Sequence, residues 1–426
     1  MSTTVKHHAS TGPAAGVRAT APSPPNRRYG LRVAWTMLAS GWSANQFSAL
    51  LGTYRTEAGL SESSATGLIA VYVVGLIPGL LAGGPLADRH GRRPVALIAL
   101  GVSLLSTCLL MAGSAATWWL LPGRLLTGVG AGALLAAGSA WVKELSSPPY
   151  DPDTSPGAAA KRSGMFVSAG FASGGLAASL IAQWAPYPTL TAYLPHLVLA
   201  AGAGAAAFGA PESRPTRSRP AGEGSAAADR PFPRARFWRA LLPVAPWVFA
   251  APTIGFVTLP GLVDGGLAGW RTVYAGVATA VVPGAGLAVQ PLARRLATRH
   301  RPATGVAGLL VIAAGFALAA PAAAQSRPWL ALAAAAVLGA GYGLTLSFGL
   351  TEVAALAPRA QLARMTSLFW TLAYTGMFTP YVVAALATTY GVPALLRAGA
   401  LLAVLACGVF ALLNPVRRGG TRRSRG

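Results

Sequence analysis

The stretch GGPLADRHGRRP, residues 83–94, concentrates charge in a chain that otherwise carries little of it. Its residues 88–93 hold one acid, one histidine and three arginines, yet long apolar runs lie on either side. Only 11% of the chain is charged and 53% is hydrophobic, whereas an ordinary soluble domain is roughly 25% charged. A soluble protein of 426 residues with this balance would expose large apolar patches and aggregate. The composition therefore favours a membrane protein whose charge is gathered in short loops.

Apolar runs recur along the chain, and a run of about 20 residues crosses a bilayer as a helix. Runs of this length do not suit the strands of a soluble parallel sheet, which are far shorter. The sequence therefore predicts an all-α integral membrane protein. Its twelve predicted transmembrane helices lie near residues 32–54, 65–85, 94–113, 117–142, 160–184, 189–211, 238–262, 270–290, 302–323, 328–354, 364–387 and 392–414.

The basic residues gather on one side of this predicted topology. With the N-terminus inside, the loops on the inner side hold most of the Lys and Arg residues. The outer side holds Arg55, Arg271, Arg327 and Arg397, and Arg124 lies within a helix. This positive-inside bias predicts a protein of the plasma membrane with both termini in the cytoplasm. The net charge of +23 thus indicates anionic membrane lipids, and not nucleic acid, as the partner.

Polar segments divide the chain into two membrane bundles. Residues 1–31 and 415–426 are polar and basic and predict disordered cytoplasmic tails. Residues 212–237 form the longest polar interior segment and predict a cytoplasmic linker. The predicted domains are an N-terminal six-helix bundle at residues 32–211 and a C-terminal six-helix bundle at residues 238–414.

Short matches between the two halves indicate a repeat. PGLLAGGPLADR at residues 78–89 aligns with GAGLAVQPLARR at residues 284–295, an offset of 206. GAG at residues 130–132 recurs at residues 339–341, an offset of 209. Matches at nearly one period support two parallel six-helix repeats, an arrangement of many secondary transporters whose substrate site lies at mid-membrane between the halves.

The charged loop carries a family motif, G-x-L-A-D-R-x-G-R-R. Its fixed positions are Gly84, Leu86, Ala87, Asp88, Arg89, Gly91, Arg92 and Arg93. With twelve predicted helices and a central linker, this loop between helices two and three resembles the major facilitator superfamily across the whole apolar part of the chain. In that family the loop is a conformational latch on the cytoplasmic side. The resemblance implies this role for the two glycines, the aspartate and the three arginines.

The residue types of the loop suit a latch on chemical grounds as well. Gly84 and Gly91 allow close backbone approach and a tight turn. Asp88, at a predicted helix end, can accept hydrogen bonds from a neighbouring helix N-terminus, and the arginines can reach carboxylates or lipid phosphates. A plain positive-inside loop would explain the arginines but not the acid or the glycines. Arg294 replaces the acid in the second copy, which favours a latch on the first half.

Two further stretches resemble motifs of the same family. Pro211, Glu212 and Ser213 resemble its exit from helix six, and we expect them to contact the latch arginines. LPGRLLTGVGAG at residues 121–132 places Arg124 about two helical turns inside helix four. A charge at such depth is expensive and usually faces a cavity or a partner. The resemblance implies that Arg124 serves proton coupling or substrate contact; the alternative is a side chain that snorkels to the interface.

Helix five resembles the exporter motif of the family in a degenerate form. The motif glycines fall at Gly157, Gly170, Gly174 and Gly175, whereas phenylalanines replace another glycine and the proline. This pattern favours export over uptake only modestly, because a face of small residues also serves helix packing.

The predicted substrate cavity is aromatic and weakly polar. In the family, helices one, four, seven and ten line it. Helices one, seven and ten, together with helix eleven, offer Trp42, Asn45, Gln46, Trp247, Phe249, Thr253, Tyr342, Thr345, Ser347, Trp370 and Tyr374. The spacing of Trp42, Asn45 and Gln46 places these three on one face of their helix, and the same holds for Trp370 and Tyr374. Such a pocket suits a bulky, partly apolar small molecule, although aromatics in membrane helices also serve packing.

The sequence thus predicts a monomeric transporter that exports a drug-like or natural-product molecule. We expect the proton gradient as its energy source and no cofactor, with Glu352 as the first candidate for the proton carrier. An uptake porter for a nutrient or organic ion, or a transporter-like sensor, remains the alternative. An enzyme is excluded because no nucleophile with a base and no metal cluster appears at depth. An ATP-driven pump is unsupported because no GxxxxGK[ST] motif is present.

Overall fold

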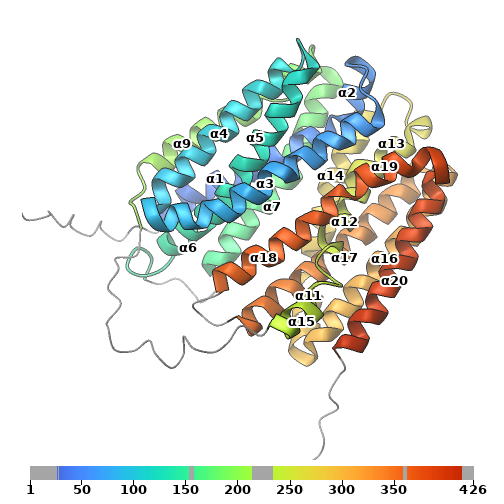
Figure 1. Ribbon diagram of the computed structural model, residues 1–426. Helices are drawn as coiled ribbons and strands as arrows, with labels where there is room; N and C mark the ends of the chain where they lie inside the picture. The colour runs from blue at the N-terminus through green and yellow to red at the C-terminus, as the bar shows by residue number, and fades with distance from the viewer. Residues whose placement is uncertain (1–25, 27, 153–157, 214–233, 358–361, 415–426) are drawn as a thin grey trace, which may run out of the picture.

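A computed structural model describes residue 26 and residues 28–152, 158–213, 234–357 and 362–414. Within these ranges the regular elements are helices, and none is a strand (Figure 1). Both predicted tails, up to residue 25 and from residue 415, and residues 214–233 of the predicted linker lie outside the described ranges.

The helices before the linker begin with the long first helix and end at Phe208. They are α1 (Arg28–Ala49), α2 (Leu51–Glu57), α3 (Glu62–His90), α4 (Arg92–Ala112), α5 (Leu120–Ala133), α6 (Ser139–Leu145), α7 (Ala158–Trp184), α8 (Pro188–Thr191) and α9 (Leu194–Phe208). A π-helical turn, Leu134–Gly138, joins α5 to α6.

The helices after the linker are α11 (Arg234–Leu241), α12 (Trp247–Thr253), α13 (Leu259–Leu262), α14 (Arg271–Ala288), α15 (Gln290–Arg299), α16 (Arg301–Ala324), α17 (Pro328–Leu356), α18 (Leu362–Thr375), α19 (Thr379–Tyr390) and α20 (Val392–Leu413). A π-helical turn, Ile254–Thr258, joins α12 to α13, and a 3₁₀ turn, Gly376–Phe378, joins α18 to α19.

Nine helical stretches of the described chain are long and apolar enough to cross a membrane, which confirms nine of the predicted spans. The predicted spans at residues 32–54, 238–262 and 364–387 are largely helical but fall short of that length or hydropathy. The first carries several buried polar side chains of α1, including Asn45 and Gln46. The other two are interrupted, by a turn at residues 242–246 and by the 3₁₀ turn before α19.

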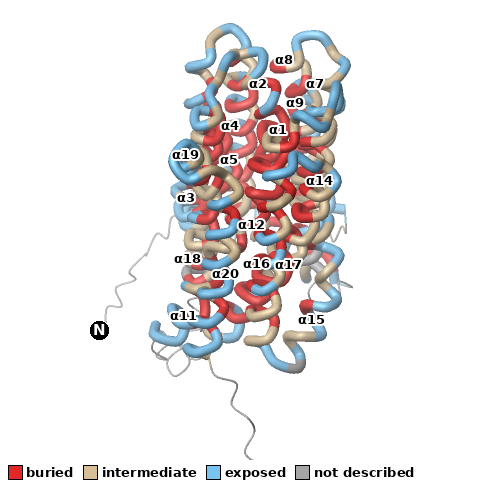
Figure 2. Tube along the Cα trace, turned by 90° about the vertical axis from the view of Figure 1, so that its right-hand side faces the viewer, coloured by how far each residue is buried: buried red, intermediate tan, exposed pale blue. Residues whose placement is uncertain are grey.

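The helices form two groups that lie side by side (Figure 1). Before the linker, α1 packs on α7 and α3 packs on α5; after it, α17 packs on α16 and α14. The two groups meet where α7 contacts α14 and where α3 contacts α18 and α19. Buried residues follow the middle of the bundle and exposed ones its periphery (Figure 2).

The bundle has two ends, which the connections define. One end, here called the latch end, carries the turn between α3 and α4 at Gly91 and the exit of α9. The opposite end, here called the far end, carries the connections from α2 to α3 and from α13 to α14. At the latch end α3 stops at His90 because Gly91 has φ +109°, a conformation that side chains disfavour.

Candidate functional site

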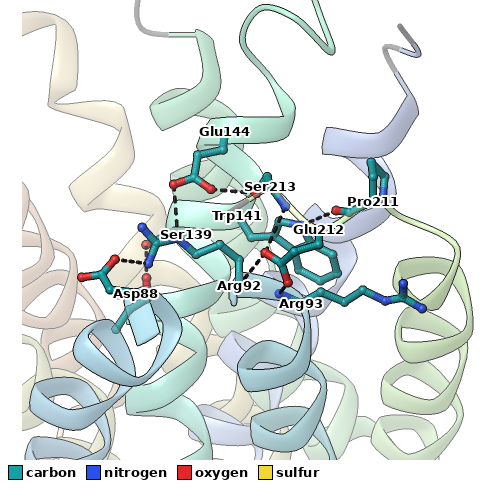
Figure 3. A network of polar contacts seen from close by, with 10 residues as sticks. Asp88, Arg92, Arg93, Ser139, Trp141, Glu144, Pro211, Glu212 and Ser213 are labelled. Atoms are coloured by element: carbon teal, nitrogen blue, oxygen red, sulfur yellow. Dashed lines mark hydrogen bonds and ion pairs between the residues drawn. The ribbon is translucent and has the colours of Figure 1, made fainter. Parts of the chain in front are cut away.

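The N-terminus of α4 is held by a carboxylate from the exit of α9. Oε1 of Glu212 accepts a hydrogen bond from the backbone amide of Arg92 at 2.8 Å, and Oε2 accepts one from Arg93 at 3.0 Å (Figure 3). Free amides and the helix dipole make a helix N-terminus a site for negative charge. The sequence argument offered Asp88 for such an interaction, whereas the structure places Glu212 at this helix N-terminus. The expected contact between the exit of helix six and the charged loop is present.

Arg92 connects Asp88 to a second carboxylate. Its Nη1 lies 2.6 Å from Oδ1 of Asp88, and its Nε donates to Oε1 of Glu144 at 3.2 Å (Figure 3). The Arg92 side chain is only 11% exposed, whereas the Asp88 side chain is 68% exposed. Asp88 therefore lies on the solvent side of the network, where a single ion pair contributes little stability.

Two residues that the sequence analysis did not identify complete this network. Glu144, at the end of α6, also accepts a hydrogen bond from the Ser213 hydroxyl at 2.7 Å. The fully buried Trp141 donates from Nε1 to the carbonyl of Pro211 at 3.0 Å. The sequence did hold one signal for Glu144, which is an acid just after the predicted span at residues 117–142.

Tyr150 adds a further contact to the exit of α9. Its hydroxyl donates to the carbonyl of Glu212 at 3.2 Å. Partial burial, and then the neighbouring Glu212 and Glu144 carboxylates, raise the pKa of the Tyr150 phenol. The hydroxyl therefore keeps its proton at neutral pH and remains a donor.

The glycines of the loop differ in how much space surrounds them. A Cβ on Gly91 would lie 2.5 Å from Oε2 of Glu212, so this position needs glycine for space as well as for its φ. Gly84, expected to allow close approach, has open space around it. The close approach is one residue earlier, because a Cβ on Gly83 would lie 2.8 Å from Cα of Ala133.

The guanidinium groups of the remaining loop arginines form no ion pair among the described residues. Arg89 is exposed at the end of α3. The Arg93 guanidinium lies over the Phe208 ring, 4.9 Å from its centroid, which is a cation–π contact.

Arg124 is fully buried and does not snorkel to the interface. Its guanidinium lies between two rings, 4.5 Å from the centroid of Phe47 and 4.8 Å from that of Tyr72. Its Nε donates to the carbonyl of Leu68 at 3.2 Å. Nη1 and Nη2 are buried and make no hydrogen bond within the described part of the chain. The two terminal nitrogens of the Arg124 guanidinium are thus unused as hydrogen-bond donors among the described residues in this conformation.

An aromatic cluster lies where the two groups of helices meet. Phe249 of α12 stacks on Tyr374 of α18, with ring centroids 4.3 Å apart and planes 11° apart. Tyr342 of α17 and Trp370 of α18 flank Phe249, with centroids at 6.0 and 6.2 Å. Tyr374 also packs in one buried cluster with Tyr72 of α3, so the aromatics join both halves. The sequence analysis offered all four residues for the cavity, and Phe249 contacts each of the other three.

The other predicted cavity residues take separate places. Asn45 donates from Nδ2 to the carbonyl of Phe171 at 2.9 Å and so ties α1 to α7. Both amide atoms of Gln46 and Nε1 of Trp42 are buried without a partner among the described residues. Trp247 packs edge-on against Phe316 of α16, with centroids 5.9 Å apart.

Glu352 lies near the latch end of α17 and is buried, with an exposed fraction of 7%. Its Oε1 is 3.9 Å from Nη2 of Arg236, which precedes the membrane-buried part of the seventh predicted helix. The acid thus lies beside a cation at one end of the bundle and away from its middle.

One family model matches most of the chain. The model of the Major Facilitator Superfamily matches residues 33–379. Multidrug resistance protein MdtL of Salmonella typhi and of Salmonella typhimurium (strain LT2) are each 39% identical over 85 residues. That match covers 20% of this chain and 21% of theirs, so the chain matches about a fifth of the length of these relatives.

Solved structures share the fold at low sequence identity. A D-xylose-proton symporter is 16% identical, with a TM-score of 0.71, over 91% of this chain and 97% of its own. A POT family transporter in complex with 5-aminolevulinic acid is 13% identical, with a TM-score of 0.68, over 92% of this chain and 98% of its own.

Proposed function

The chain belongs to the Major Facilitator Superfamily, and from that premise we propose that it exports a planar, partly apolar small molecule from the cytoplasm in exchange for protons. Family membership and the apolar helices make it a multi-pass membrane transporter and not an enzyme. The export direction, the drug-like or natural-product substrate class and the proton coupling are the proposal. The proposal also includes twelve crossings of the plasma membrane, with both termini in the cytoplasm.

The repeat within the chain supports two halves of six helices each. Glu144 lies in the last turn of α6 and Glu352 lies near the end of α17, both toward the latch end and 208 residues apart. This separation falls between the offsets of 206 and 209 that the other two matches give. Both acids lie beside an arginine, Arg92 for the first and Arg236 for the second.

The basic loops support an assignment of the latch end to the cytoplasm. The turn at residues 89–93 and the segments at residues 234–239 and 294–301 all carry arginines at that end. Because positive loops stay on the cytoplasmic side, the far end faces the outside in this proposal. The helix groups contact each other near the far end, for example where Gln183 donates to the carbonyl of Gly269 at 2.7 Å. This contact is expected of a conformation closed to the outside.

The aromatic cluster is the observation that carries the substrate class. The stacked pair Phe249 and Tyr374, flanked by Tyr342 and Trp370, offers flat apolar faces with few hydrogen-bonding groups. Aromatic rings prefer offset stacking or edge contacts with other π systems. A planar, aromatic molecule fits such faces better than a sugar, which would need more amides and carboxylates.

The glycines of α7 support export. A Cβ on Gly170 or Gly174 would collide with the backbone of α1, and one on Gly175 would collide with Thr279 of α14. Three glycines of the degenerate exporter motif thus lie where α7 packs against α1 and α14, and Gly157 lies outside the described residues. The partial match to a multidrug resistance protein points the same way.

A transport assay in a pump-deficient bacterial host tests this proposal. Cells that express the protein should accumulate less of a planar probe such as ethidium than cells that express Asp88→Asn, and an uncoupler should abolish the difference. Nile red serves as a neutral planar probe, and xylose as a non-planar control. Greater accumulation of any probe would reverse the direction to uptake, and no effect of the uncoupler would remove proton coupling.

A further inference from the structure

Two arginines from different helices lie at the end of α9. Arg93, the second residue of α4, places its guanidinium 4.9 Å from the centroid of the Phe208 ring. Arg32 of α1 reaches the next residue of the chain, because a Cβ added at Gly209 would lie 3.9 Å from its Nη1. Since α9 packs on both α1 and α4, two cations flank its last residues at the latch end.

Both guanidinium groups keep their hydrogen-bond donors unused among the described residues. Arg93 contacts the Phe208 ring, and the Arg32 guanidinium lies 6.0 Å from the centroid of the Tyr29 ring. A contact with a ring leaves the N–H groups at the edge of a guanidinium available for an acceptor. The carbonyl groups at a helix C-terminus also attract cations, yet in the described part of the chain neither guanidinium donates to a carbonyl of α9.

The carboxylates of the charged loop bind other groups. Oε1 and Oε2 of Glu212 accept hydrogen bonds from two backbone amides at the start of α4. Asp88 and Glu144 pair with the Arg92 guanidinium. Among the described residues, the two guanidinium groups at the end of α9 therefore have no acid that offsets their charge, and the site favours an anion.

The surface beside these arginines is apolar and exposed. Phe208 is 66% exposed, Val198 on the same helix is 74% exposed, and Ile98 of α4 is 67% exposed. Val198 lies ten residues before Phe208, so this face extends about 15 Å along α9. In a membrane protein such a face contacts acyl chains. The arginines lie where the face ends, at the depth where lipid head groups begin.

We propose that Arg32 and Arg93 bind the phosphate of an anionic phospholipid, with an acyl chain on Phe208 and on the apolar face of α4 and α9. Guanidinium groups bind phosphate through charge-assisted, often paired, hydrogen bonds. A zwitterionic head group would bring an ammonium beside two guanidinium groups, where no described carboxylate is free to receive it, so a net negative charge is favoured. This inference does not depend on the substrate, the direction or the energy source of transport.

Native mass spectrometry of the full chain in detergent measures this binding, with phosphatidylglycerol and phosphatidylethanolamine as the two probes. Arg32→Gln with Arg93→Gln removes both cations and keeps the backbone amide that Glu212 caps. Arg294→Gln with Arg301→Gln is the matched control, because it removes the same charge from two exposed positions at the latch end of the second half. A basic residue near a membrane surface contributes about fivefold to the binding of anionic lipid.

We therefore expect the dissociation constant for phosphatidylglycerol to rise about 25-fold in the first pair and less than about twofold in the control pair. Arg32→Lys with Arg93→Lys keeps both charges and should retain most of the affinity. Equal constants for the parent and for Arg32→Gln with Arg93→Gln would overturn the site. A parent that binds phosphatidylethanolamine as tightly as phosphatidylglycerol would overturn it as well.

Photo-cross-linking locates the lipid without removing either arginine. The photoreactive residue p-benzoylphenylalanine would take the place of Phe208 or, as the control, of Leu412, which is 82% exposed near the latch end of α20. In nanodiscs with equal amounts of the two lipids, position 208 should capture phosphatidylglycerol in excess, and position 412 should capture both lipids equally. Equal capture at position 208 would overturn the site. Neither readout involves transport, so this inference and the proposed function fail separately.

Discussion

The carboxylate of Glu212 lies 2.8 Å from the backbone amide of Arg92, although 120 residues separate the two along the chain. This contact, with the companion bond to Arg93, fastens the exit of α9 to the start of α4. It does so within the first half of the molecule, as do the bonds from Arg92 to Asp88 and Glu144. Among the described residues, the bonds that brace the charged loop therefore come from the first half.

Removal of this carboxylate should lower stability. Glu212→Ala leaves two amides of α4 without their acceptor, and loss of a helix cap costs about 0.5–2 kcal/mol. We expect a lower thermal midpoint for the purified protein in detergent, measured by tryptophan fluorescence. Glu212→Gln keeps one acceptor oxygen and should fall between the parent and Glu212→Ala. Equal midpoints for all three proteins would show that the cap contributes nothing.

Asp88→Asn should lower transport without lowering stability. Its exposed ion pair with Arg92 contributes about 0–1 kcal/mol in this conformation, so the thermal midpoint should stay close to that of the parent. If the loop is a latch that acts in another conformation, transport should fall about tenfold, which corresponds to about 1.4 kcal/mol of coupling. Glu57→Gln, at the opposite end, is the control. Unchanged flux in Asp88→Asn would remove the latch role.

Phe249→Ala should weaken recognition of a planar substrate. The ring stacks on Tyr374 and contacts two further aromatics, and such aromatic contacts contribute about 0.5–1.5 kcal/mol each beyond area burial. We expect KM for ethidium efflux to rise about tenfold, whereas Tyr374→Phe, which keeps the ring, should change it less than about twofold. Equal KM values for the parent and Phe249→Ala would show that the substrate binds elsewhere.

Arg124→Met should separate function from stability. A buried charge with unused donors costs desolvation energy, and its replacement by an apolar side chain of similar length is often neutral or stabilising. We expect transport to fall at least about tenfold while the thermal midpoint stays equal or rises. Arg397→Gln, which removes an exposed arginine, is the control. A large fall in the midpoint together with the loss of flux would instead make Arg124 a structural residue.

Glu352→Gln tests the proposed proton carrier. If this acid carries the proton, the amide should abolish the pH dependence of transport and leave a pH-independent residual flux. Initial rates in everted vesicles between pH 5.5 and pH 8.5 would measure it, with Glu57→Gln as the control. A retained pH dependence would exclude Glu352 and direct attention to other acids of the chain.

Much of the fold could be predicted because hydrophobic length is a local property. Nine predicted spans are confirmed as long apolar helices, and Gly91 at the tight turn follows from one residue's backbone freedom. The first predicted helix, at residues 32–54, is not one of the nine, because its buried polar residues, such as Asn45 and Gln46, lower its hydropathy. These side chains face protein and not lipid, which a sequence pattern alone does not reveal.

The site was harder to predict, because its contacts are long-range. No local pattern tells that Glu212, and not Asp88, reaches the start of α4. Gly83 and Gly84 show the limit on a finer scale, since adjacent positions on a helix point about 100° apart. A motif that names one of them therefore does not say which one meets the neighbouring helix. Phe249 was one of several candidates on helix seven, and its central place arises from partners on two other helices.

The bracing of the charged loop has a mechanical consequence. Its bonds fasten α3, α4, α6 and the exit of α9 into one piece, whereas the corresponding turn of the second half has Arg294 in place of the acid. Among the described residues, the charged loop of the first half is thus tied to three other segments, whereas Arg294 forms no ion pair. A rocking motion between the halves would therefore carry α3, α4, α6 and the exit of α9 together.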